Sequence, residues 1–153
     1  MKAFDYFLKL NKIPRGSYNE KEVADYICTF ANEHKLKFVR DKYNNVKVFK
    51  DNNSKVSVIL QAHLDMVCEK LVGVDFDFER QEIQTIIEDD IIRTNGTTLG
   101  GDDGFGVSLI LEALEKCGQG YPNIEAVFTT MEEVGMVGAK NLDMTDLKSR
   151  YML

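Results

Sequence analysis

The sequence predicts an α/β domain in which helices flank a mostly parallel, mixed sheet. Two apolar runs, at 56–61 (VSVILQ) and 124–130 (IEAVFTT), are typical of central strands that are covered on both faces. Segments with the helical spacing of apolar residues separate the strand-like runs. The 153 residues show no internal repeat and no linker, so these elements are expected to share one core.

The first third of the chain is expected to form two helices and two strands. Ala3–Leu10 has the pattern of a short amphipathic helix, and a longer helix follows it. Two pairs with capping-box spacing stand at the start of this longer helix: Ser17 with Glu20, and Asn19 with Glu22. Its apolar stripe consists of Val23, Tyr26, Ile27 and Phe30. The segment KFVRDKYNNVKVFKD predicts two short strands around an Asn-Asn turn.

The remaining elements follow from turn signals and periodicity. QTIIEDDIIRTNG predicts a hairpin with Asp89 and Asp90 at its turn. A helix after the glycine-rich segment TTLGGDDGFG is expected to end at Gly118, with an apolar stripe of Val107, Ile110, Leu111, Leu114 and Cys117. A short helix is expected over about 138–147, and RYML at 150–153 resembles the start of another strand.

Composition and charge argue against several classes of protein. The net charge of −6 disfavours a nucleic-acid groove, which needs clustered Lys and Arg. No segment has the roughly 18 apolar residues of a membrane span, and the N-terminus shows no secretion signal. The three cysteines are odd in number and form no CxxC pair, which favours reduced thiols in a cytoplasmic protein.

Three groups of polar residues lie at the ends of predicted strands or at a junction with a helix. His63 and Asp65 end the first apolar strand and, two residues apart in extended backbone, share a face. A carboxylate behind an imidazole is the usual support of a histidine that binds a metal. A buried core histidine, hydrogen-bonded within the fold, is the alternative interpretation.

The second and third groups are carboxylate pairs. Asp102 and Asp103 stand among four glycines before a helix, where a phosphate would be repelled and no P-loop Lys-Ser/Thr is present. A cation suits an aspartate at this place, although a glycine-rich helix cap would give the same pattern. Glu132 and Glu133 follow the second strand. They form either a solvated loop or a pair in which one binds a metal and the other accepts a proton from water.

Together, the three groups indicate a two-metal hydrolase site. Ligands bind open α/β sheets at the carboxyl ends of the strands, which is where these groups fall. Two ions in such sites share a bridging carboxylate and lie roughly 3.5–4 Å apart. Imidazole and carboxylate ligands favour zinc, with manganese and cobalt as alternatives.

Three motifs, in this order and spacing, resemble the aminoacyl-histidine dipeptidases: HLDMVCEK, GTTLGGDDGFGV and TMEEVGMVGA. These enzymes belong to the co-catalytic zinc peptidases, a larger group that also includes tripeptidases. The segments IPRGSYNE and NNV extend the similarity over nearly the whole chain. The resemblance implies hydrolysis of a small peptide substrate of the Xaa-His type, and the charge and hydropathy argue against nucleic-acid or membrane partners.

The resemblance also implies a role for each motif residue. His63 would bind one zinc ion, and Asp65 would orient that imidazole. Asp102 would bridge both ions, and the peptide bond between Asp102 and Asp103 would be strained or cis. Glu132 would act as the general base, and Glu133 would bind the second ion. The resemblance therefore makes Glu132 and Asp65 catalytic residues, and His63, Asp102 and Glu133 metal ligands.

The family pattern requires a further aspartate on the next strand and a histidine near its C-terminus, and neither is found after Glu133. Residues 1–153 are therefore expected to be the N-terminal part of the catalytic domain, without its C-terminal part and its lid or dimerisation domain. An exposed sheet edge would also permit homo-oligomers. A tripeptidase or aminopeptidase, and a non-catalytic binding domain with a vestigial metal site, are the alternatives.

Overall fold

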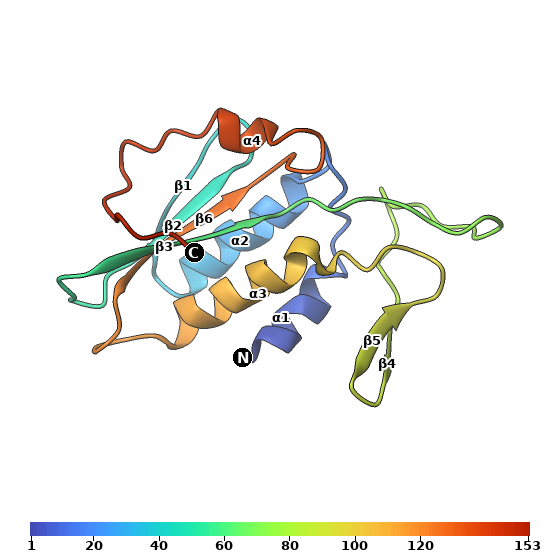
Figure 1. Cartoon of the computed structure of the whole chain (residues 1–153), viewed down its shortest axis with the longest axis horizontal. Helices are drawn as coiled ribbons and strands as arrows, with labels where there is room; N and C mark the ends of the chain where they lie inside the picture. The colour runs from blue at the N-terminus through green and yellow to red at the C-terminus, as the bar shows by residue number, and fades with distance from the viewer.

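The computed structural model describes all residues, 1–153, and contains four helices and six strands. Figure 1 shows them from the N-terminus in blue to the C-terminus in red. In chain order, the elements are α1 (Ala3–Leu10), α2 (Lys21–Glu33), β1 (Lys37–Arg40), β2 (Val46–Lys50), β3 (Ser57–His63), β4 (Thr85–Glu88), β5 (Ile91–Thr94), α3 (Gly101–Lys116), β6 (Asn123–Thr129) and α4 (Val137–Lys140).

The main sheet has the strand order β1-β2-β6-β3. Strands β3 and β6 are parallel, and α3 lies in the crossover between them, whereas β2 is antiparallel to both β1 and β6. The predicted α/β class and mixed sheet are confirmed. Only one of the three strand pairs in the main sheet is parallel, fewer than expected. The turn at 41–45 joins β1 and β2 as a hairpin, and the strands of a hairpin are antiparallel.

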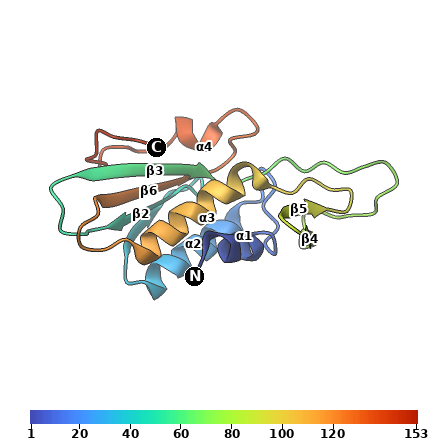
Figure 2. The same cartoon turned by 60° about the horizontal axis from the view of Figure 1, so that its bottom comes forward.

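Helices α1, α2 and α3 cover one face of the sheet, and α4 lies on the other face (Figure 2). Alternate strand residues point toward the three helices, as the two-residue period of a strand requires. Val46 and Val48 of β2 and Ala126 and Phe128 of β6 are fully buried there. They pack with apolar residues of the helices, among them Val23, Ile27, Val107, Leu111 and Leu114.

The opposite face of the sheet is more polar and is covered by the chain after β6. Lys47 and Glu125, on neighbouring strands, are buried there although both are charged. The ammonium of Lys47 donates to the Asp143 carbonyl at 2.7 Å, and the Glu125 carboxylate accepts the backbone N–H groups of Lys148 and Ser149. These contacts hold the segment 141–150 against the sheet.

Most predicted elements are confirmed, including the hairpin β4–β5 with its turn at Asp89 and Asp90. The last residues also behave as predicted, since the Ile59 N–H donates to the Tyr151 carbonyl at 2.8 Å and Met152 forms a parallel bridge with Ile59. The helix expected over 138–147 is wrong in extent, because α4 covers only Val137–Lys140. None of the helices combines the length and the hydropathy that crossing a bilayer requires.

The capping-box prediction for α2 is wrong. The N-cap residue of this helix is Glu20, and no side chain caps it. Two of the residues in the proposed boxes have long-range partners instead. The Ser17 hydroxyl donates to the Asp65 carboxylate at 2.7 Å, and the Glu20 carboxylate accepts the Met131 N–H at 3.0 Å. Both contacts reach the region where β3 and β6 end.

Candidate metal centre at the ends of β3 and β6

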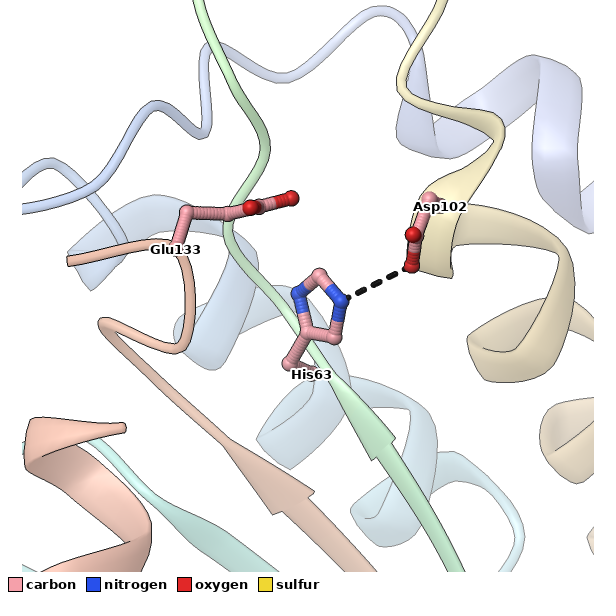
Figure 3. Close-up of side chains that lie close together, drawn as sticks. All are labelled: His63, Asp102 and Glu133. Atoms are coloured by element: carbon pink, nitrogen blue, oxygen red, sulfur yellow. Dashed lines mark hydrogen bonds and ion pairs between the residues drawn. The ribbon is translucent and has the colours of Figure 1, made fainter. Parts of the chain in front are cut away.

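The sheet brings the first and third polar groups to the same edge. His63, the last residue of β3, pairs in register with Thr129, the last residue of β6. The chain after β6 carries Glu132 and Glu133, so both glutamates begin close to the imidazole. The start of α3 supplies the second group, as Figure 3 shows for Asp102 beside His63.

Three side chains converge on one point, each from a different segment of the chain. Ligand atoms of His63, Asp102 and Glu133 all lie within 4.8 Å of one another. The Nε2 atom of His63 is 3.0 Å from Oδ1 of Asp102. The His63 side chain is only 10% exposed, whereas the Asp102 side chain is 88% exposed and Glu133 is also exposed. The cluster therefore has a fixed base and a rim that is open to solvent, as a site that admits an ion requires.

The local backbone at the start of α3 directs Asp102 toward the imidazole. Gly100, the N-cap, has a positive φ of 69°, and Asp102 and Asp103 depart from helical φ and ψ. The peptide bond between Asp102 and Asp103 is cis, in agreement with the resemblance. Asp103 does not join the cluster; its carboxylate accepts the Gly106 N–H at 3.1 Å and so caps the first turn of the helix.

Asp65 lies beneath the cluster and holds its parts together. Its side chain is fully buried, and its two oxygens accept hydrogen bonds from the Ser17 hydroxyl and from the backbone N–H groups of Glu132 (3.0 Å) and Glu133 (3.2 Å). Burial alone would raise the pKa of Asp65, but these bonds and the contact with His63 lower it to about 2. The carboxylate is therefore ionised and connects the loop before α2 to the glutamate pair.

Asp65 also contacts the imidazole, but mainly through its backbone. Nδ1 of His63 is 3.1 Å from the Asp65 carbonyl oxygen and 3.5 Å from its carboxylate. Nε2 remains directed at Asp102. The predicted side-chain contact with Asp65 exists, but the carbonyl makes the shorter one. Either acceptor fixes the orientation of the ring and leaves Nε2 free to bind an ion.

The electrostatics of the cluster favour a cation. Burial lowers the pKa of His63, but hydrogen bonds to Asp65 and Asp102 outweigh it and raise the pKa to about 9. The pKa of Glu133 is raised, first by burial and then by the nearby charges of Glu132, Asp102 and Asp65. Carboxylates that repel one another around a single imidazolium lose this repulsion when a divalent ion binds. The donor set of one imidazole and two carboxylates suits zinc, manganese or cobalt.

Glu132 is not among the three converging side chains. Its side chain is half-buried and lines an apolar cavity of about 290 Å³ together with His63, Thr129, Met136 and Met152. Its backbone N–H is held by Asp65. The two adjacent glutamates thus face different surroundings, one the cluster and one the cavity.

Arg15 is a further residue of this region that the sequence did not indicate. It is only 2% exposed, and its guanidinium donates to the carbonyl oxygens of Leu64 (3.0 Å), Asp65 (3.4 Å) and Gly100 (2.6 Å). Burial lowers the pKa of Arg15 to about 10, so it keeps its charge at neutral pH. Arg15 therefore ties the end of β3 to the glycine-rich turn before α3, which places His63 and Asp102 side by side. A Cβ atom at Gly100 would collide with this guanidinium.

The fold is that of a metallopeptidase, and the comparisons with known proteins agree. The family model for peptidase family M28 matches residues 44–150, more than two thirds of the chain. The chain belongs to this peptidase family.

Individual relatives have peptidase names. The chain is 36% identical to the cytosol non-specific dipeptidase of Escherichia coli over 154 residues, which cover 98% of the chain and 32% of that protein. The crystal structure of aminoacylhistidine dipeptidase from Vibrio alginolyticus superimposes with a TM-score of 0.91 at 35% identity, covering 98% of this chain and 31% of that one. A Staphylococcus aureus tripeptidase shares the fold, with a TM-score of 0.80 at 23% identity over 99% of this chain and 42% of that one. The chain spans about a third of the length of the two dipeptidases.

Proposed function

We propose that this chain carries part of the catalytic site of a metal-dependent dipeptidase that hydrolyses short peptides of the Xaa-His type. The convergence of His63, Asp102 and Glu133 within 4.8 Å is the observation that carries the proposal. Similarity to two dipeptidases over 98% of the chain supports it. In this proposal, His63, Asp102 and Glu133 would hold two zinc ions.

In this proposal, different residues of the chain have different roles in hydrolysis. When bound, ions of this kind polarise a carbonyl and stabilise the negative charge that develops on its oxygen. Asp65 and Arg15 keep the imidazole, the aspartate and the glutamate pair in place. The Glu132 carboxylate accepts a proton from the attacking water and returns it to the nitrogen of the leaving amine.

Metal binding is the first test of the proposal. Because the resemblance places further ligands in a part of the family pattern that residues 1–153 lack, we expect weak binding of zinc by this chain. Isothermal calorimetry after chelator treatment should detect this binding, and His63→Gln should abolish it. His34→Gln, which changes the other histidine, is the matched control and should bind as the parent does. If no zinc, manganese or cobalt binds, the proposed metal site is wrong.

The role of Glu132 requires a second measurement. Glu132→Gln should lower the rate of Xaa-His hydrolysis by about 10²–10⁴-fold and leave metal binding unchanged, because it removes only a proton acceptor. Glu82→Gln, at an exposed position without side-chain partners, should change neither. Loss of metal from Glu132→Gln would reassign this residue as a ligand. A panel of dipeptides and tripeptides separates the dipeptidase from a tripeptidase or aminopeptidase. Tight, stoichiometric zinc binding by residues 1–153 without any hydrolysis would favour a binding domain.

We also propose a cytoplasmic location and self-association. Cys28, Cys68 and Cys117 are all free, which suits a reducing compartment, and the Escherichia coli relative is named a cytosol enzyme. Beyond the short contact with residues 151–153, β3 has no partner on its outer edge, and such edges promote pairing between chains. Size-exclusion chromatography with light scattering tests for homo-oligomers, and a monomer at all concentrations would contradict them.

A further inference from the structure

Residues 69–98 form an arm that projects away from the main sheet and includes the hairpin β4–β5 (Figure 1). Asn95 and Gly96 lie in this arm, directly after β5. Asparagine is chemically labile, because the backbone nitrogen of the next residue can attack its side-chain amide carbon. Glycine in the next position permits this attack best, since it has no Cβ atom to crowd the nitrogen. The chain contains no second Asn-Gly pair.

The structure leaves both reacting groups of this pair available. The Asn95 side chain is exposed, and neither its oxygen nor its nitrogen takes part in a hydrogen bond. The Gly96 N–H has no acceptor either, although the Gly96 carbonyl accepts the Leu71 N–H at 2.8 Å. Attack of the Gly96 nitrogen on the Asn95 side chain therefore breaks no hydrogen bond of the fold.

The turn itself requires the glycine. Gly96 has a positive φ of 86°, which a residue with a Cβ atom rarely adopts. A Cβ atom at this position would also lie 2.8 Å from Cγ2 of Val74. The residue that makes the pair reactive is thus fixed by the geometry of the turn.

Asn53 offers an internal comparison. Its side chain is also exposed and makes no hydrogen bond, and the small residue Ser54 follows it. The Ser54 N–H, however, donates to the side-chain oxygen of Asn123 at 3.2 Å. The nitrogen next to Asn53 must give up this bond before it can attack, whereas the nitrogen of Gly96 has none to give up.

We propose that Asn95 is a site of spontaneous deamidation, and that the isoaspartyl product loosens the attachment of the arm. The Gly96 nitrogen loses its proton to base and bonds to Cγ of Asn95, and the amide nitrogen leaves as ammonia. Water then opens the resulting succinimide ring. Cleavage of the new bond between Cγ and nitrogen gives aspartate, and cleavage of the original peptide bond gives isoaspartate. The only co-reactant is water, and the proposal is independent of the proposed peptidase function.

The isoaspartyl product would disturb the contacts that follow the turn. Thr97 forms an antiparallel bridge with Lys70, and the Thr98 N–H donates to the Glu69 carbonyl at 2.8 Å. Isoaspartate adds one methylene group to the backbone just before these residues and shifts them out of register. Aspartate adds the same negative charge but leaves the backbone unchanged. These contacts join the chain after β3 to the chain before α3, so their loss frees the base of the arm.

Incubation of the full chain at mildly alkaline pH tests for the modification, because base removes the proton from the attacking nitrogen. Peptide mapping by mass spectrometry measures the amide lost at each asparagine, and an isoaspartyl methyltransferase with a labelled methyl donor detects the isoaspartyl product. Asn95 should lose its amide at least about tenfold faster than Asn53. Asn95→Gln should remove the isoaspartyl signal, because glutamine would have to form a larger, less favoured ring.

The same measurement in urea separates the contribution of the fold from that of the sequence. Unfolding frees the Ser54 N–H but leaves both dipeptides unchanged. The ratio of the Asn95 rate to the Asn53 rate should therefore be about two- to tenfold larger in the native chain than in urea, the range that one hydrogen bond provides. Gly96→Ala should slow the reaction of Asn95 about tenfold in urea, where strain in the turn plays no part.

Hydrogen exchange measures the effect on the arm. The amides of Leu71 and Thr98 should exchange at least about tenfold faster in the isoaspartyl form, because both donate across the contacts at the base of the arm. Asn95→Asp carries the added charge on an unaltered backbone and should exchange as the parent does.

Equal rates at Asn95 and Asn53 in the native chain would overturn the proposed site. A ratio that is the same in urea as in the native chain would show that the hydrogen bond of Ser54 does not set the selectivity. Unchanged exchange in the isoaspartyl form, or equally fast exchange in Asn95→Asp, would overturn the proposed loosening through the backbone.

Discussion

Replacing Asp65 by asparagine would remove the buried charge on which the geometry of the candidate centre depends. The carboxylate accepts the Ser17 hydroxyl on one side and the N–H groups of Glu132 and Glu133 on the other. An amide has one oxygen, so its NH₂ group must face one of these donors. The serine hydroxyl can reverse and accept from the amide. In either orientation of the amide, one glutamate N–H loses its acceptor.

The cost of Asp65→Asn follows from these contacts. One buried N–H without an acceptor costs about 1–3 kcal/mol, and each remaining bond to a neutral acceptor is weaker by about 1 kcal/mol than a bond to a charged one. Part of this loss is returned, because a carboxylate no longer has to be desolvated. We expect the free energy of unfolding to fall by about 2–4 kcal/mol. Zinc affinity should fall about 10–100-fold, the usual effect of losing a residue that orients ligands.

Urea denaturation of the metal-free chain measures the first effect, and calorimetric titration with zinc measures the second. Asp75→Asn is the matched control, since Asp75 is exposed and makes no side-chain contact; its free energy of unfolding should stay within about 0.5 kcal/mol of the parent. If Asp65→Asn matched this control in both assays, Asp65 would not be the support that its hydrogen bonds indicate.

Three further substitutions test other contacts. Gly138→Ala should destabilise the fold by about 1–3 kcal/mol, because its Cβ would lie 2.5 Å from a buried amide oxygen, whereas Gly118→Ala meets open space and should be neutral in the same urea assay. Burial raises the pKa of Glu20, so stability falls as the pH rises through that pKa; Glu20→Gln, which still accepts the Met131 N–H, should be more stable than the parent at neutral pH and equal to it in acid. Arg15→Lys should lower stability by about 1.5–3 kcal/mol, since one ammonium cannot reach three carbonyls, and should weaken zinc binding in calorimetry.

The sequence predicted the elements whose signals are local. Ala3–Leu10 agrees with α1 at both ends, and the hairpin β4–β5 was visible from its turn. The antiparallel pairing of β2 with β6 was not visible, because strands that are far apart in sequence leave no mark of their relative direction. The helix expected over 138–147 is shorter for a similar reason. Lys47 and Glu125 hold residues 143–149 through backbone groups, which a periodicity argument does not detect.

The candidate site also contains some residues that the sequence predicts and others that it does not. His63, Asp102 and Glu133 could be found because each stands in a short motif of unusual composition, and the fold brings all three together. Arg15 and Ser17 could not be found from the residues alone. Both act across about fifty residues of sequence, Arg15 on backbone carbonyls and Ser17 on a carboxylate. The spacing of Ser17 from Glu20 also fits a capping box, so the local pattern predicts the wrong partner for Ser17.

The exposed and the buried residues of the candidate site should respond differently to substitution. Asp102 and Glu133 are exposed, so a substitution there removes a charge that water already solvates and costs little stability. Asp65 and Arg15 are buried and are hydrogen-bonded to the backbone of the segments that carry the ligands, so a substitution there perturbs folding and metal binding together. His63 lies between the two groups, buried at its ring but with Nε2 at the rim of the cluster. Variants at these five positions should therefore fall into two groups when stability is plotted against zinc affinity, with His63 closer to the exposed ligands because its ring can be replaced by a glutamine of similar size.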